Sequence, residues 1–377
     1  MRHRTVRFVS AGIALALFLG CLTAASAATA AAEEKIQLAI LLDTSNSMDG
    51  LIGQAKSQLW KIVNELARAK RHGRHPVLEV ALFEYGNDGL RHAEGYVRMV
   101  ADLTTDLDLI SERLFALTTN GGDEYCGAVI GRAVDKLSWS GSDDVLKVIY
   151  IAGNEPFDQG SVSYKASALK AVKKGIVVNT IFCGPFDEGV ATSWKDGAIR
   201  GEGRYLSIDQ DAAVEDIATP FDADLIRLGE ELNGTYVAYG RAGEEAKNRQ
   251  VAQDANAATM GAASSVQRSV AKAQEAYTND DWDLADAVQS GAVKVGTLKD
   301  AELPEAMRKM SVAEREKYVA GLIASRAELE RRINELNEQR RVFVEKEMKN
   351  RAQTSTLGEA ILLTVKEQVE REGFALE

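Results

Sequence analysis

The sequence predicts an α/β fold with a doubly wound, mostly parallel sheet, followed by an all-helical region. First, short apolar runs bounded by turn residues alternate with helically spaced segments between residues 35 and 240. Second, residues 36–42 are apolar apart from Gln37, which is typical of a strand buried on both faces. Third, strand signals vanish after residue 241, where Ala, Glu, Arg, Lys and Gln dominate.

The elements of the first region follow one another in a regular order. Apolar runs predict strands at residues 36–42, 77–85, 97–100, 145–152, 176–183 and 204–208. Apolar residues at steps of three and four predict helices at residues 50–71, 107–117, 127–137, 164–174 and 211–232, the last with a break near Pro220. Ligands of such sheets bind beyond the carboxyl ends of the strands, so the residues that follow each strand are the candidates for function.

The second region, residues 241–377, is predicted to be helical. Residues 243–277 and 312–349 have helical composition, and residues 283–303 are ambiguous. Residues 318–345 carry an a/d heptad pattern, which predicts a coiled-coil segment, but Arg326 and Arg340 stand at a positions. A homodimer through this helix and an antiparallel hairpin packed on the body therefore both remain open.

The N-terminal residues indicate export. Residues 1–27 combine a basic start, an apolar stretch from Phe8 to Leu19 and a small-residue cleavage motif, as in a secretory signal peptide. We expect a periplasmic or secreted protein, or alternatively a lipoprotein anchored at Cys21. The apolar stretch is short for a membrane span, so we do not expect an integral membrane protein. A net charge of −11 argues against nucleic acid as a partner.

The sharpest motif is Asp43-Thr44-Ser45-Asn46-Ser47, directly after the first predicted strand. One carboxylate and two hydroxyls in a tight loop offer three oxygen ligands to a small cation, and Mg²⁺ prefers oxygen ligands in octahedral geometry. Alternatively, Asp43 and the serines only cap the helix that follows.

The run from Leu41 to Met48 resembles the opening of von Willebrand factor A (VWA) domains. That resemblance covers about residues 35–240 and implies a doubly wound sheet with helices on both faces. It also implies a metal-ion-dependent adhesion site, in which the D-x-S-x-S motif is joined by a Thr from a second loop and an Asp after the fourth strand. Members of the family mostly bind protein ligands, often through the metal.

Two positions depart from the family pattern. Asp123 stands where the family has the Thr, and Gly153 stands where it has the Asp. We therefore predict a metal site made by Asp43, Ser45, Ser47 and Asp123, to which Asn154 or Glu155 contributes directly or through water. Mg²⁺ is the expected cation, with Ca²⁺ or Mn²⁺ as alternatives. A metal-free scaffold that acts through its helical tail is the alternative function.

Two cysteines remain after export, and a pair in an oxidising compartment favours a disulfide. Cys126 follows the Asp123 loop and Cys183 ends a strand, so a Cys126–Cys183 bridge is expected, with two unpaired thiols as the alternative. The sequence contains no G-x-S-x-G hydrolase motif, no H-E-x-x-H zinc-peptidase motif, and neither the G-x-x-x-x-G-K-[ST] nor the G-x-G-x-x-G nucleotide-binding motif. We therefore expect a binding module rather than an enzyme, whose partner is a protein that presents an acidic side chain.

Overall fold

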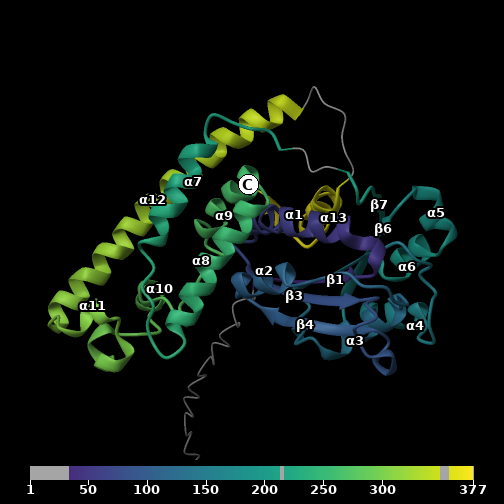
Figure 1. Ribbon diagram of the computed structural model, residues 1–377, viewed down its shortest axis with the longest axis horizontal. Coiled ribbons are helices and arrows are strands. Elements are labelled where there is room, and N and C mark those ends of the chain that lie inside the picture. The colour runs from purple at the N-terminus through teal and green to yellow at the C-terminus, as the bar shows by residue number, and fades with distance from the viewer. Residues whose placement is uncertain (1–33, 213–215, 349–355, 377) are drawn as a thin grey trace, which may run out of the picture. The chain divides into compact units, whose positions relative to one another are not determined.

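The computed structural model describes residues 34–212, 216–348 and 356–376 (Figure 1). The predicted signal peptide, residues 1–27 with Cys21, lies outside the described residues. A six-stranded sheet has the order β4-β3-β1-β5-β6-β7, in which β4 is antiparallel to β3 and the other pairs are parallel. The predicted fold class is confirmed, although the antiparallel edge strand was not foreseen.

Each predicted strand is present. The strands of the main sheet are β1 (Lys35–Asp43), β3 (Val77–Tyr85), β4 (Val97–Thr104), β5 (Leu146–Gly153), β6 (Ile176–Cys183) and β7 (Glu202–Ile208). A small second sheet pairs β2 (Ala69–Lys70) with β8 (Ala375–Leu376). Strand β1 is buried beyond its first residue because it lies between β3 and β5 and is covered on both faces.

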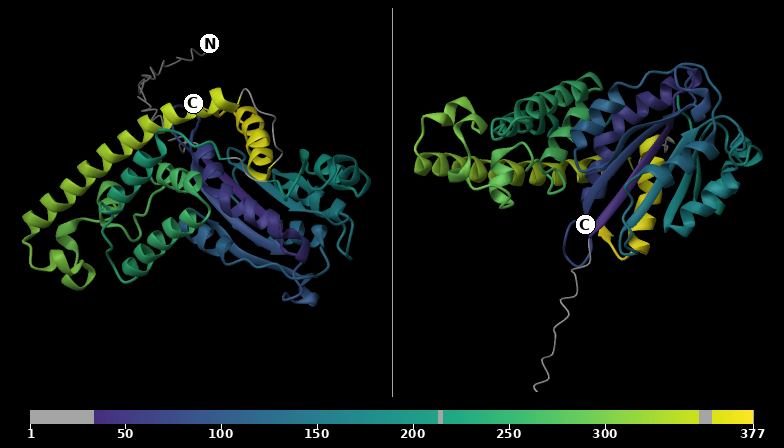
Figure 2. Two further views of the ribbon diagram at one scale, coloured as in Figure 1. Left: turned by 45° about the horizontal axis from the view of Figure 1, so that its top comes forward. Right: turned by 90° about the horizontal axis from the view of Figure 1, so that it is seen from below.

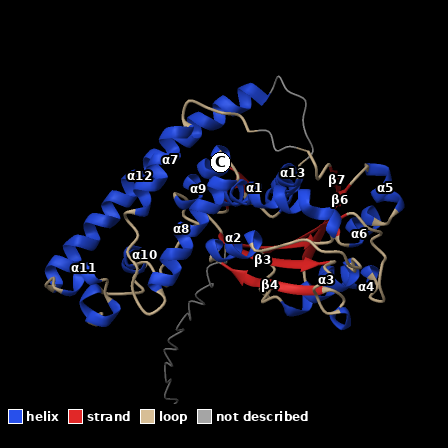
Figure 3. Cartoon of the chain, in the orientation of Figure 1, coloured by secondary structure: helices blue, strands red, loops and turns tan. Residues whose placement is uncertain are grey.

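Helices cover both faces of the sheet (Figure 3). Alternate residues of β1 point to opposite faces, so Ile40 and Leu42 belong to one core and Ala39 and Leu41 to the other. The first core includes residues of α1 (Asp49–Ala67) and α2 (Leu107–Phe115). The second includes residues of α3 (Cys126–Lys136), α4 (Tyr164–Lys173) and α6 (Trp194–Arg200), and α5 (Phe186–Ala191) precedes α6.

The region after β7 is helical, as predicted. Its helices are α7 (Asp222–Asn233), α8 (Gly243–Thr259), α9 (Ala262–Lys272), α10 (Leu284–Gln289), α11 (Glu305–Arg308) and α12 (Val312–Met348). Short 3-10 turns also occur, namely η1 (Asn46–Met48), η2 (His92–Glu94), η3 (Val295–Thr297) and η4 (Asp300–Glu302). No helix in the described ranges is both long enough and apolar enough to cross a membrane.

The last helix, α13 (Leu357–Arg371), returns to the sheet and packs against α1 and β7 (Figure 2). It begins at a capping box, in which Thr356 and Glu359 each accept from the other's backbone N–H. Its apolar face joins the same core as β1 through Leu357, Ile361, Val365 and Val369. The sheet is therefore completed by the end of the chain, and α7 to α12 form an insertion between β7 and α13 rather than a separate tail.

Of the two alternatives for the heptad of residues 318–345, the structure shows α12 packed on helices of the same chain. Its apolar face contacts α7, α9 and α10 of the same chain, and Leu329 and Ile333 are buried there. Arg326 Nη1 lies 2.7 Å from Asp283 Oδ2, and Arg340 Nε lies 2.9 Å from Asp222 Oδ1. The two a-position arginines are buried because carboxylates of the same chain neutralise them, so this face is not free for a second copy.

Candidate functional site

The candidate site lies at the carboxyl end of β1. Asp43 is fully buried, and its Oδ1 accepts a hydrogen bond of 2.8 Å from the backbone N–H of Ser45. Its other oxygen, Oδ2, is buried and has no hydrogen-bond partner. A buried carboxylate oxygen without a donor is costly unless the group is protonated or meets a cation.

The environment of Asp43 raises its pKa from 3.8 to about 7. Burial is the main cause, and the negative charge of Glu155 adds to it, while hydrogen bonds from Ser45 and from the backbone N–H of Asn154 oppose the shift. Near neutral pH the Asp43 carboxyl group is thus present in both its protonated and its ionised form. A cation placed beside Oδ2 would favour the ionised form.

Three other predicted ligands gather around Asp43. The hydroxyl oxygens of Ser45 and Ser47 lie 3.3 Å apart, and the Asn154 amide donates to Ser47 Oγ at 3.1 Å. Glu155 is exposed, and its carboxylate accepts from Gln159 at 3.2 Å. Of the two residues proposed to replace the missing Asp, the structure therefore joins Asn154 to the serine loop.

The second loop places its two carboxylates differently. Asp123 is exposed and accepts a hydrogen bond of 2.9 Å from the Tyr125 hydroxyl. Glu124, which follows it, is buried, and its Oε2 has no hydrogen-bond partner. A Cβ on Gly86 would lie 2.7 Å from both Asp43 Oδ1 and the Cγ of Glu124, so these two side chains converge beside Gly86. The buried side chain of this loop that lies beside Asp43 is thus Glu124.

Gly153 is required by the packing beside Asp43. A Cβ at this position would lie 2.4 Å from the Tyr85 hydroxyl and 3.0 Å from Asp43 Oδ2. The Tyr85 hydroxyl fills the space and donates to the Ala152 carbonyl at 3.0 Å. A side chain at residue 153 is therefore excluded while Tyr85 holds this position, so an Asp would not fit there.

The expected Cys126–Cys183 disulfide is absent, and both cysteines are free, buried thiols. Cys126 belongs to the core that α3 and α4 cover, whereas Cys183 belongs to the core on the opposite face of the sheet. The Cys126 thiol instead lies 3.8 Å from the Tyr85 hydroxyl. Burial raises the pKa of both thiols, so neither is an activated nucleophile.

The residues present fit a small, hard cation held by few protein ligands. Among the described residues, no group of three or more His, Cys, Asp and Glu side chains is arranged to hold a metal ion. The available donors are instead two carboxylates, Asp43 and Glu124, and the hydroxyls of Ser45 and Ser47. Mg²⁺ usually keeps several waters and takes one or two carboxylates, so this set suits it.

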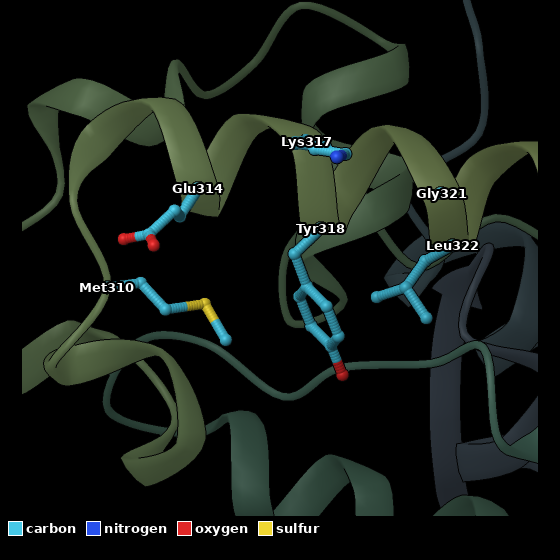
Figure 4. Close-up of a pocket in the computed structure, with 6 residues that line it drawn as sticks. All are labelled: Met310, Glu314, Lys317, Tyr318, Gly321 and Leu322. Atoms are coloured by element: carbon cyan, nitrogen blue, oxygen red, sulfur yellow. The ribbon is translucent and has the colours of Figure 1, made fainter.

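A separate hollow lies on the helical insertion (Figure 4). It has a volume of about 510 Å³ and is lined by Met310, Glu314, Lys317, Tyr318, Gly321 and Leu322. Tyr318 and Leu322 project from α12 toward the same side. None of these residues belongs to the loops at the strand ends, so this hollow is not part of the Asp43 site.

No family model matches the sequence, and no curated protein matches it. Solved structures similar to the chain include the conserved hypothetical protein BatB from Bacteroides thetaiotaomicron (17% identity, 46% of this chain and 90% of that chain, TM-score 0.36). Another is the von Willebrand factor domain of the type V pili tip protein Mfa5 from Porphyromonas gingivalis (12% identity, 47% of this chain and 91% of that chain, TM-score 0.35). A third is a von Willebrand factor type A protein from Catenulispora acidiphila (15% identity, 47% of this chain and 39% of that chain, TM-score 0.34).

Proposed function

We propose that this chain is a VWA-type protein-binding module that uses a divalent cation, with Mg²⁺ as the first candidate. Asp43, Ser45 and Ser47 hold the cation from one loop, and Glu124 approaches it from the second. The partner is a protein whose acidic side chain fills an open position in the metal's coordination shell. No step of this function requires a catalytic group.

The observation that carries the proposal is the pair of unpartnered oxygens, Asp43 Oδ2 and Glu124 Oε2. The Asp43 and Glu124 side chains meet beside Gly86. A divalent cation bound there would supply a partner for these two oxygens. The adjacent hydroxyls of Ser45 and Ser47 add neutral oxygen donors on the side of the first loop.

The test is thermal unfolding of the chain from residue 34 onward, in EDTA and then in Mg²⁺, Ca²⁺ or Mn²⁺. A cation that binds only the folded state stabilises it by about 2.7 kcal/mol at a hundredfold excess over Kd. We expect a clear rise in Tm for the wild type and none for Asp43→Ala. If neither protein responds to millimolar cation, the metal-free scaffold becomes the better account, and the helical insertion becomes the place to search for its partner.

We also propose that the protein acts outside the cytoplasm, in the periplasm or as a secreted protein. This rests on the basic, apolar and small-residue segments of residues 1–27. Fractionation of expressing cells, with mass spectrometry of the mature N-terminus, tests it. A terminus near residue 28 supports cleavage, a lipid-modified Cys21 indicates an anchored form, and an intact Met1 in the cytoplasm contradicts export.

A further inference from the structure

We propose that Lys272 and Asn233 become joined by an intramolecular amide bond, with Asp254 as the proton carrier. The bond forms between Lys272 Nζ and Asn233 Cγ, and ammonia leaves. The three side chains come from three helices of the insertion, since Asn233 ends α7, Asp254 lies in α8 and Lys272 ends α9. The inference concerns a self-modification of the chain and does not depend on the proposed cation site.

The three side chains already touch one another. Lys272 Nζ lies 2.6 Å from Asn233 Oδ1 and 2.7 Å from Asp254 Oδ2. The Asn233 amide nitrogen, which is the leaving group, donates to the same Asp254 oxygen at 2.7 Å. One carboxylate oxygen therefore bridges the nucleophile and the leaving group. Reactants held together in a suitable orientation can reach effective concentrations of about 10⁵–10⁸ M, which compensates for the low reactivity of an amide.

The environment of Lys272 makes its amine a nucleophile. Its side chain is only 2% exposed, which is rare for a lysine. Burial lowers the pKa of Lys272 from 10.5 to about 8, although the charge of Asp254 opposes the shift. At neutral pH a fraction on the order of a tenth of the Lys272 side chain is therefore the neutral amine. A desolvated lysine of this kind is a recognised form of activated nucleophile.

Asp254 carries the one proton that the reaction moves. As the neutral amine attacks Asn233 Cγ, Asp254 Oδ2 accepts a proton from Nζ and passes it to the amide nitrogen. The bond from Cγ to Nδ2 breaks, ammonia leaves, and the bond from Cγ to Nζ remains. No oxidant, reductant or cofactor is required. Arg268 Nε donates to the other Asp254 oxygen, Oδ1, at 2.7 Å, which fixes the orientation of the carboxylate.

The surroundings hold Asn233 in place and leave an exit for ammonia. Lys247 Nζ donates to the backbone carbonyl of Asn233 at 2.7 Å. Asn233 and Asp254 are half-buried, whereas Lys272 is buried, so the leaving-group side of the cluster faces the surface. Asn233 and Lys272 are 39 residues apart, and the segment between them includes all of α8. The bond would thus restrict the unfolded chain as a disulfide does, without sensitivity to reductants.

The test is peptide mapping of the full-length chain by mass spectrometry after digestion with trypsin. Trypsin does not cut after an acylated lysine, so we expect residues 228–241 joined to residues 269–294, with the mass of one ammonia missing. Lys272→Arg keeps the charge but has no amine, so it should give separate peptides. Lys247→Arg is the matched control, because Lys247 contacts only the backbone carbonyl of Asn233 in this cluster, and it should keep the joined peptide.

Asp254→Asn tests the proton carrier. We expect at least about tenfold less joined peptide from this variant, because general acid–base catalysis typically contributes more than that. Circular dichroism checks that the variant remains folded, so that loss of the bond is separated from loss of structure. A joined peptide that forms equally in Asp254→Asn would overturn the role assigned to Asp254.

Two results for the wild type would overturn the bond itself. Separate peptides of full mass from the folded protein would mean that the cluster only holds the three helices together by hydrogen bonds. Loss of ammonia confined to residues 228–241, and unchanged in Lys272→Arg, would mean that the backbone nitrogen of Gly234 attacks Asn233 instead.

Discussion

Asp43 and Glu124 converge beside Gly86, although one ends β1 and the other lies in the loop before α3. Asp43 Oδ1 and the Cγ of Glu124 would each lie 2.7 Å from a Cβ on Gly86. Each carboxylate has one buried oxygen without a partner. This relationship gives the site its anionic character and is the basis of the first two predictions.

Glu124→Gln should weaken Mg²⁺ binding at least about tenfold, because an amide oxygen carries no net charge to neutralise the cation. Asp123→Asn should change it much less, because Asp123 is exposed and hydrogen-bonded to Tyr125. Calorimetric titration of the two isosteric variants compares them directly. A larger loss for Asp123→Asn would restore the ligand assignment that the sequence suggested.

The pKa of Asp43 predicts how metal-free stability depends on pH. Its folded value of about 7 is above the ordinary 3.8, so the folded state binds the proton more tightly. The proton on Asp43 stabilises the folded state fully below about pH 4. This contribution to the free energy of unfolding, on the order of a few kcal/mol, is lost as the pH rises through 7. Urea unfolding in EDTA at pH 5 and pH 8 should show this loss in the wild type but less of it in Asp43→Asn. An equal loss in both would remove Asp43 as its source.

Cys126 and Cys183 should both react with a thiol reagent when the purified protein is unfolded without reductant. The reason is that they belong to cores on opposite faces of the sheet. Mass spectrometry of the labelled peptides measures this. A Cys126–Cys183 cross-linked peptide from non-reduced protein would contradict the structure.

Arg326→Met should destabilise the protein by about 3–5 kcal/mol, because it leaves Asp283 buried without its cation. Arg331→Met on the same helix is the control. Arg331 pairs with exposed Glu328 and Glu335, and such pairs contribute about 0–1 kcal/mol. Denaturant unfolding of both variants tests the difference, and similar effects would argue against burial of Arg326.

A chain that ends at residue 240 should fail to fold cooperatively, because it lacks α13. Burial of each large apolar side chain contributes about 1.5–3 kcal/mol, and α13 supplies several of them to a domain whose total stability is about 5–15 kcal/mol. Near-ultraviolet circular dichroism and urea unfolding measure the outcome. A variant that joins residues 356–377 to residue 240 through a Gly/Ser linker, in place of residues 241–355, should be more stable. If the shorter chain is equally stable, α13 is not part of this core.

Local patterns predicted much of this fold. Strand β1 and helix α1 follow from burial and periodicity, and the Asp43 motif follows from its place after β1. The return of α13 was missed because its partner surface on α1 lies hundreds of residues earlier in the chain. Glu124 was missed because the sequence places it beside Asp123 and cannot tell which carboxylate points inward. The heptad in α12 left a dimer and a helix packed on the same chain both open, because periodicity shows an apolar face but not what covers it.

The most direct test of the account is calorimetric titration of Mg²⁺ into the EDTA-stripped chain from residue 34 onward, beside Asp43→Asn. We expect the wild type to bind a single cation and Asp43→Asn to lose that binding while it remains folded. Mg²⁺ binding that persists unchanged in Asp43→Asn, or no binding of Mg²⁺, Mn²⁺ or Ca²⁺ by the wild type, would contradict it.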